Sequence, residues 1–159
     1  MNDLEKASPI FILSFCWRTG STLLQRVINS SGEALIWGEP HVLPQLFNSF
    51  RKLTSLSKET DWARKQVKEN GWEASWAPTI QPDKKYIDSA SRSALFDIYG
   101  QSALDEGFSR WGFKEVRPDA ANNARFLKRI FPSCRIVFHY RDPVEVHLSI
   151  SKKIGRAHV

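Results

Sequence analysis

Buried-strand patterns alternate with amphipathic stretches along this chain of 159 residues. The first apolar run, residues 10–15, predicts a strand. A polar loop over residues 16–20 follows it, and then a helix over residues 21–28 with Leu23, Leu24, Val27 and Ile28 on one face. Further strands are predicted at residues 34–37, 86–89, 111–116 and 135–140.

Helical patterns occupy the stretches between these strands. They cover residues 42–68, with a break near 53–57, and residues 91–104 and 119–130, whereas residues 70–85 predict an ordered loop. Strands that alternate with helices are typical of a parallel sheet covered by helices. The predicted fold class is therefore α/β, with a P-loop-like parallel β-sheet flanked by helices.

Composition narrows the class of protein further. With 42% hydrophobic residues the chain can form one core, which predicts a single domain. The net charge of +6 is spread along the chain and favours small anionic ligands or acidic substrates over nucleic acid, although a merely basic surface explains it equally well. Cys16 and Cys134 lack the spacing of metal ligands, and two such cysteines are typical of a reducing compartment. The polar N-terminus resembles neither a signal peptide nor a membrane span. Both observations predict a cytoplasmic protein.

The last six residues, IGRAHV, match the translation of a common sequencing adapter, ATC GGA AGA GCA CAC GTC. The two preceding adapter bases, AG, complete a lysine codon, as Lys153 requires. We therefore expect residues 1–153 to be one incomplete domain and residues 154–159 to be a non-native tail. A natural C-terminus at Val159 is the alternative.

The segment "FILSFCWRTGSTLLQRV" has the chemistry of an anion-binding loop. A turn between a buried strand and a helix presents backbone N–H groups and the positive end of the helix dipole, which together bind phosphate or sulfate. Arg18 adds a permanent cation, and Ser21 and Thr22 add hydroxyl groups. Gly20 stands where a nucleoside-triphosphate loop has its lysine, which argues against Mg-ATP. An ordinary strand–turn–helix remains the alternative.

This loop resembles that of the sulfotransferases, which use 3′-phosphoadenosine 5′-phosphosulfate (PAPS). Their pattern, [KR]-x-G-[ST]-[ST], holds the 5′-phosphosulfate, and residues 18–22 match it position by position. The resemblance implies that the cofactor is bound by Arg18, Thr19, Gly20, Ser21, Thr22 and Leu23, without a metal. It also implies a sulfotransferase fold, here truncated at its C-terminal end.

A second motif, "IVFHYRDPVEVHLS", follows the last predicted strand. Sulfotransferases place an arginine there and a serine eight residues later, and both bind the 3′-phosphate; Arg141 and Ser149 have this spacing. An arginine fork and a hydroxyl two helical turns further along can converge on one phosphate. A surface Arg141–Asp142 pair and a solvated Ser149 are the structural alternatives.

Lys114 lies in "RWGFKEVRP", between the two anion motifs. This strand resembles the family segment whose lysine approaches the transferring sulfuryl group, which implies a catalytic role for Lys114 beside Arg18; Arg117 is a weaker candidate for ligand contact. Strand alternation places Lys114 on the face of Gly112 and Val116. A solvent-exposed lysine on an edge strand is the alternative.

Glu39, in "IWGEPHVLP", is the predicted general base. Several sulfotransferase branches, including the tyrosylprotein and heparan types, have a catalytic glutamate in a comparable segment, and partial burial near Trp37 would raise its basicity. Capping of the next helix is its structural alternative, and His41 is the rival base. His139 is expected to be a packed residue; His147 lies beside the second motif, and His158 lies in the tail.

The resemblance implies transfer of a sulfuryl group from PAPS to an acceptor hydroxyl on a small molecule, carbohydrate or peptide. Residues 41–85, which include Trp62, Trp72 and Trp76, are expected to form the acceptor pocket. No nucleic-acid partner and no membrane association are expected. The alternatives are a P-loop kinase for a nucleotide or small molecule and a non-catalytic module that binds PAP (the desulfated product) or phosphate. Activity of the shortened chain alone is in question.

Sequencing of the parent locus tests the origin of the tail. The codons after Lys153 are expected to differ from those of residues 154–159. Genomic codons for residues 155–159 would refute the adapter hypothesis.

Overall fold

A computed structural model describes residues 8–40, 43–73 and 80–156. The chain divides into two compact units. One unit comprises Met1–Pro40 and Leu95–Val159, and the other comprises His41–Ala94.

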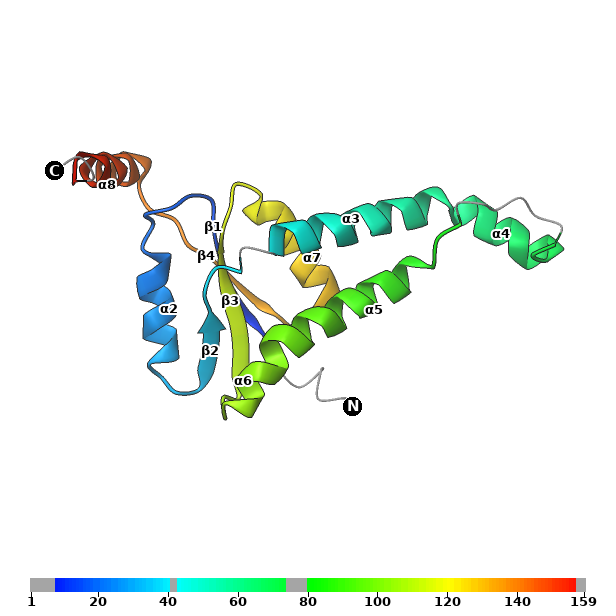
Figure 1. Ribbon diagram of the computed structural model, residues 1–159, viewed down its shortest axis with the longest axis horizontal. Coiled ribbons are helices and arrows are strands. Elements are labelled where there is room, and N and C mark those ends of the chain that lie inside the picture. The colour runs from blue at the N-terminus through cyan, green and yellow to red at the C-terminus, as the bar shows by residue number, and fades with distance from the viewer. Residues whose placement is uncertain (1–7, 41–42, 74–79, 157–159) are drawn as a thin grey trace. The chain divides into compact units, whose positions relative to one another are not determined.

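The first unit is built on a four-stranded parallel sheet (Figure 1). Its strands, β1 (Ile10–Ser14), β2 (Ala34–Trp37), β3 (Arg110–Val116) and β4 (Arg135–Phe138), lie in the order β2-β3-β1-β4. These four strands were predicted within one to two residues of their observed ends. The α/β prediction, with a parallel sheet flanked by helices, is confirmed.

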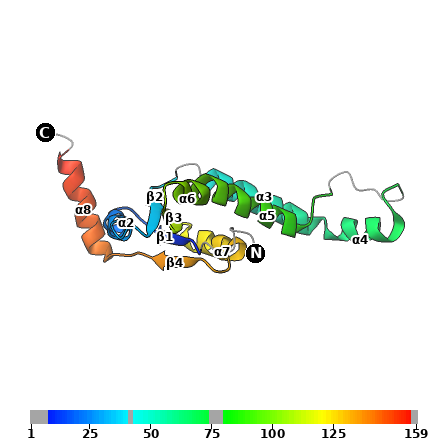
Figure 2. The ribbon, with the colours of Figure 1, turned by 90° about the horizontal axis from the view of Figure 1, so that it is seen from below.

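The sheet is covered on both faces because the crossover from β1 to β2 and the crossover from β3 to β4 run in opposite directions. Helix α2 (Ser21–Asn29) connects β1 to β2, and helix α7 (Ala120–Ile130) connects β3 to β4. Right-handed crossovers that leave neighbouring strands in opposite directions place their helices on opposite faces. Figure 2 shows α2 and α7 on either side of the strands.

One face of the sheet is packed with aromatic rings. Phe11 of β1 lies 4.5 Å from Phe113 and 5.9 Å from Trp111 of β3 (ring centroids). Phe131, which follows α7, and Phe96 close the cluster around Trp111. Burial of these large rings provides the main apolar stabilisation of this unit.

The apolar stripe of α2 is only partly covered. Leu23 and Val27 stay more than half exposed, whereas Leu24 and Ile28 are half-buried. The strand at the sheet edge, β4, is also incompletely buried, and Phe138 is exposed.

The second unit is helical. It contains α3 (Leu43–Glu59), α4 (Asp61–Asn70) and most of α5 (Lys84–Leu95). Helix α5 continues into the first unit as a π-helical turn, η1 (Phe96–Gln101), and α6 (Ser102–Asp105). Helix α8 (Pro143–Arg156) also belongs to the first unit.

Two local predictions in the second unit are wrong. Residues 86–89 belong to α5 and not to a strand: Ile87 and Ser91 are both buried at i, i+4 spacing, and the Ser91 hydroxyl donates to the Ile87 carbonyl oxygen. A short apolar run does not distinguish the two periods. The helix break lies at Thr60 and not near residues 53–57, because Thr60 leaves the helical backbone conformation and is the N-cap of α4 (φ −100°, ψ 12°).

Among the described residues, none of the helices combines the length and apolar character needed to span a bilayer.

Gly112 allows the central strands to approach closely. It pairs with Ile10 of β1 and Ile36 of β2. A Cβ atom at this position would lie 1.7 Å from the carbonyl oxygen of Ile10. Backbone atoms in the middle of a sheet cannot move aside as a flexible side chain can.

Gly112→Ala is therefore expected to lower the free energy of unfolding by about 3 kcal/mol, the upper end of typical overpacking effects. Gly38→Ala is the matched control, since no atom lies within 4 Å of its Cβ position, and it is expected to change stability by less than about 0.5 kcal/mol. Urea denaturation measures both. Equal stability of the two variants would contradict this description of the sheet.

Glu115 is a buried carboxyl group in β3. Its Oε1 accepts a hydrogen bond of 3.3 Å from Arg117 Nε, whereas its buried Oε2 has no hydrogen-bond partner among the described residues. Burial raises the pKa of Glu115 above the ordinary value of 4.5, and the neighbouring Arg117 charge offsets only part of this effect.

This raised pKa makes stability pH-dependent. Between 4.5 and the higher native pKa, the native state binds more protons at Glu115 than the unfolded state does, so its contribution to stability is present below 4.5 and lost as pH rises. Glu115→Gln is expected to gain stability relative to wild type as pH rises above 4.5. Exposed Glu106→Gln is the control. If the difference in the free energy of unfolding between wild type and Glu115→Gln did not change with pH, the assignment would be contradicted.

Candidate active site

The candidate site lies where β1 and β3 end. The crossover from β1 leads to one side of the sheet and the crossover from β3 leads to the other, so their carboxyl ends flank the topological switch point. Open α/β sheets bind ligands in the crevice at this point. The residues that follow both strands are therefore placed together by topology.

The loop after β1 has an unusual backbone at two positions. Arg18 has φ 65°, in the left-handed region, and Gly20 has φ 99°. Gly20 is the N-cap of α2, and its carbonyl oxygen accepts from the amides of Leu23 (2.9 Å) and Leu24 (3.2 Å). The amides of Ser21 and Thr22 have no acceptor within the helix, because first-turn N–H groups point out of it. This geometry suits an anion.

Thr19 turns away from the loop surface. Its buried hydroxyl lies 3.3 Å from Ser14 Oγ, and its carbonyl oxygen lies 3.0 Å from His139 Nε2. His139 follows β4, and its own amide donates to the Leu13 carbonyl oxygen. The loop is thus tied to the ends of β1 and β4.

Arg18 and Ser149 come together although 131 positions separate them in the sequence. Arg18 Nε donates a 3.0 Å hydrogen bond to Ser149 Oγ. Arg141 donates through Nε to the Glu145 carboxylate, at 2.6 Å, within the first turns of α8. The two anion motifs of the sequence therefore lie at one place in the structure.

Lys114 and Glu39 form an ion pair. Lys114 Nζ lies 2.5 Å from Glu39 Oε1, and the side chains are 4% and 26% exposed. Lys114 therefore is not a solvent-exposed edge lysine: its strand lies inside the sheet, and its ammonium group has an anionic partner. Trp37, expected near Glu39, donates through Nε1 to the Tyr99 carbonyl oxygen.

A cavity of about 570 Å³ collects these groups. Seven of the residues predicted for the site line it, and they are Arg18, Gly20, Ser21, Thr22, Glu39, Arg141 and Ser149. The other three predicted residues do not line it: Thr19 is buried beneath the loop, Leu23 is exposed on α2, and Lys114 reaches the site through Glu39.

Trp17 and Val116 also line the cavity, and sequence reasoning assigned them no role. The Trp17 side chain is 65% exposed, which is high for an indole next to a charged loop. Its position directly before Arg18 was the feature of the sequence that could have indicated a place in the site. Val116 is the last residue of β3, where the switch-point rule would have found it.

The remaining candidates fall elsewhere. Arg117 pairs with Glu115 and does not line the cavity. His147 is exposed on α8. His41 and His158 lie outside the described residues.

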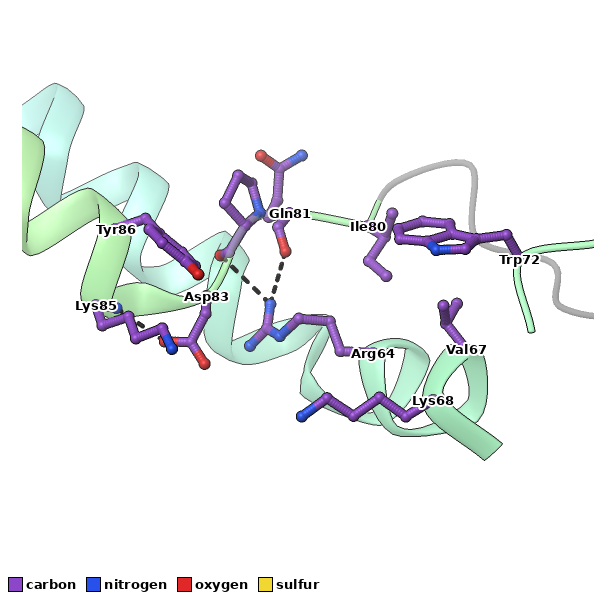
Figure 3. A pocket seen from close by; sticks show the side chains of 10 residues that line it. Arg64, Val67, Lys68, Trp72, Ile80, Gln81, Asp83, Lys85 and Tyr86 are labelled. Carbon is purple, nitrogen blue, oxygen red and sulfur yellow. Dashed lines mark hydrogen bonds between the residues drawn. The ribbon is translucent and has the colours of Figure 1, made fainter. Parts of the chain in front are cut away.

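A second cavity of about 570 Å³ lies within the helical unit (Figure 3). Trp72 and Tyr86 supply aromatic surface, and Lys68 and Lys85 supply positive charge. Arg64 donates a 2.8 Å hydrogen bond to the Gln81 carbonyl oxygen across this cavity. Of the tryptophans expected in an acceptor pocket, Trp72 lines this cavity, Trp62 does not, and Trp76 lies outside the described residues.

The charge of Glu39 also acts on the buried carboxyl group of Glu115, which does not line the cavity. The raised pKa of Glu115 comes first from burial, and the negative charge of Glu39 adds a smaller contribution in the same direction.

Within residues 8–40, 43–73 and 80–156, no cluster of three or more His, Cys, Asp or Glu side chains could hold a metal ion.

Comparison with known proteins places this site in a family. A search of curated proteins found no match. A scan against protein-family models matches residues 9–158, nearly the whole chain, to the model described as "Sulfotransferase family". The match spans the anion loop, Glu39, Lys114 and the Arg141–Ser149 motif, and the chain belongs to the sulfotransferase family.

Proposed function

We propose that the chain transfers a sulfuryl group from PAPS to an acceptor hydroxyl, with Glu39 as the general base. The observation that carries the proposal is the Arg18–Ser149 hydrogen bond, because it joins the 5′-side and 3′-side anion motifs in one cavity. The cavity wall offers hydrogen-bond donors from two arginines, from two hydroxyl-bearing residues at the N-terminus of α2 and from Ser149. Such a set of donors suits a ligand with two separated anionic groups.

The residues fit the two ends of the donor differently. The amides of Ser21 and Thr22, with Arg18, suit the 5′-phosphosulfate, while Arg141 and Ser149 suit the 3′-phosphate and so favour PAPS over ATP. The exposed Trp17 indole offers a stacking surface for the purine. A cavity of about 570 Å³ lies within the usual range for such ligands.

Glu39 and Lys114 would act as a pair. Lys114 keeps the Glu39 carboxylate in place at the cavity wall, and it can transfer its hydrogen bond to the sulfuryl oxygens when the donor is bound. Glu39 then accepts the proton of the acceptor hydroxyl as the new S–O bond forms and the S–O bond to the 5′-phosphate breaks, releasing PAP. Arg18 and the loop amides stabilise the charge on the departing phosphate.

Calorimetry tests the donor assignment. The chain is expected to bind PAP more tightly than adenosine 5′-phosphate, which lacks the 3′-phosphate. Arg141→Ala is expected to remove most of this preference, about 10- to 100-fold, since one charge-assisted contact is lost. Equal affinity for the two ligands in wild type, or Mg-dependent ATP binding without PAP binding, would refute the proposal.

A matched variant controls for charge. Arg125→Ala removes one positive charge from the exposed surface of α7, away from the cavity lining, and is expected to leave PAP affinity within about twofold. An equal loss in Arg125→Ala and Arg141→Ala would mean that net charge, and not a 3′-phosphate contact, determines affinity.

Glu39→Gln tests the base. The variant keeps the shape and an acceptor oxygen for Lys114 but cannot accept the proton, so transfer is expected to fall by about 100-fold or more while PAP affinity changes only a few-fold. Transfer of ³⁵S from labelled PAPS to a panel of phenols, saccharides and hydroxyl peptides measures turnover. Undiminished transfer in Glu39→Gln would assign the base to another residue.

A further inference from the structure

We propose that His139 is a positioning residue that fixes the orientation of the Thr19–Gly20 peptide, so that the N–H of Gly20 faces the anion cavity. The inference rests on the proposed function, because it concerns the loop that would hold the 5′-phosphosulfate. His139 was expected from the sequence to be a packed side chain, and it does not line the cavity.

The contact itself defines the chemistry of the ring. His139 Nε2 lies 3.0 Å from the Thr19 carbonyl oxygen. A carbonyl oxygen can only accept, so Nε2 carries the proton of this hydrogen bond. The backbone of His139 is fixed at the same time, because its amide donates a 2.9 Å hydrogen bond to the Leu13 carbonyl oxygen at the end of β1.

The Thr19 carbonyl determines where the next amide points. In a planar trans peptide, the C=O and the following N–H lie on opposite sides. The Thr19 oxygen faces His139, so the Gly20 N–H faces away from the ring, and Gly20 is part of the cavity wall. Rotation of this peptide by half a turn would direct a carbonyl dipole at the bound anion in place of an N–H donor.

Glycine makes such a rotation easy at this position. Gly20 has φ 99°, and without a Cβ it can adopt the φ values on both sides of a peptide rotation. Its virtual Cβ would lie 3.5 Å from His139 Nε2, in ordinary van der Waals contact, so the ring lies directly against the loop. Gly20 therefore allows two orientations of the Thr19–Gly20 peptide. The hydrogen bond from His139 selects one of them.

His139 also connects the two anion motifs. It lies two residues before Arg141, in the same short segment that leaves β4. One strand end thus supplies a cation for the 3′ side and a positioning hydrogen bond for the 5′-side loop.

Nuclear magnetic resonance tests the contact without any nucleotide. The ¹⁵N shifts of the His139 ring in wild type are expected to show the Nε2–H form. The Gly20 amide resonance is expected to shift in His139→Phe, which keeps the ring volume without a donor, and to return toward the wild-type position in His139→Gln. Glutamine places its amide nitrogen the same number of bonds from Cβ as His139 Nε2. An Nδ1–H ring, or an unmoved Gly20 amide in His139→Phe, would overturn the proposal.

Calorimetry with PAP then tests the consequence. His139→Phe is expected to weaken binding about 10- to 100-fold, because one N–H donor to an anion is lost and a carbonyl replaces it. His139→Gln is expected to recover most of the affinity. His147→Phe, at an exposed site on α8, is the matched control and is expected to bind like wild type.

The outcomes separate this inference from the proposed function. Failure of wild type to bind PAP refutes the donor assignment, while the resonance measurements still decide the role of His139. Normal PAP binding by His139→Phe, or equal losses in His139→Phe and His139→Gln, would refute the positioning role alone.

Discussion

Parallel pairing of β1 between β3 and β4 places the charged groups of the site. Because the three strands run in one direction, their carboxyl ends meet at one edge of the sheet. The loop at Arg18, the end of β3 near Val116 and the segment at His139 all leave from that edge. Gly112 makes the pairing possible by allowing the β1 backbone to approach β3. A change in strand register would separate the groups that line the cavity without altering any of them.

The cations of the cavity already have partners within the chain. Lys114 is bonded to Glu39, Arg141 to Glu145 and Arg18 to Ser149. A phosphate or sulfate that enters must exchange with these acceptors, so the gain in free energy is smaller than the number of contacts suggests. The partly exposed Arg141–Glu145 pair is the easiest to exchange. The largely buried Lys114–Glu39 pair is harder to separate.

The sequence predicted the strands that carry the site, because each is an apolar run bounded by polar residues. It also predicted six residues of the cavity wall from two short motifs, and a seventh, Glu39, from the segment after β2. It failed for residues 86–89, where a few apolar residues fit a strand and a helix equally. It assigned no place in the site to Trp17, which lines the cavity, and it could not predict the contact of His139 with Thr19, which only the folded chain makes. His139 meets Thr19 across 120 positions of sequence.

Arg18 has a consequence for protein engineering. It adopts φ 65°, a conformation that glycine adopts with little strain and that disfavours a side chain by roughly 1–2 kcal/mol. Selection for thermal stability alone would therefore favour glycine at this position. Such a variant would be more robust and would lack the guanidinium that meets Ser149. Directed evolution of this protein for heat resistance would need a simultaneous screen for ligand binding, because at this residue stability and activity favour different amino acids.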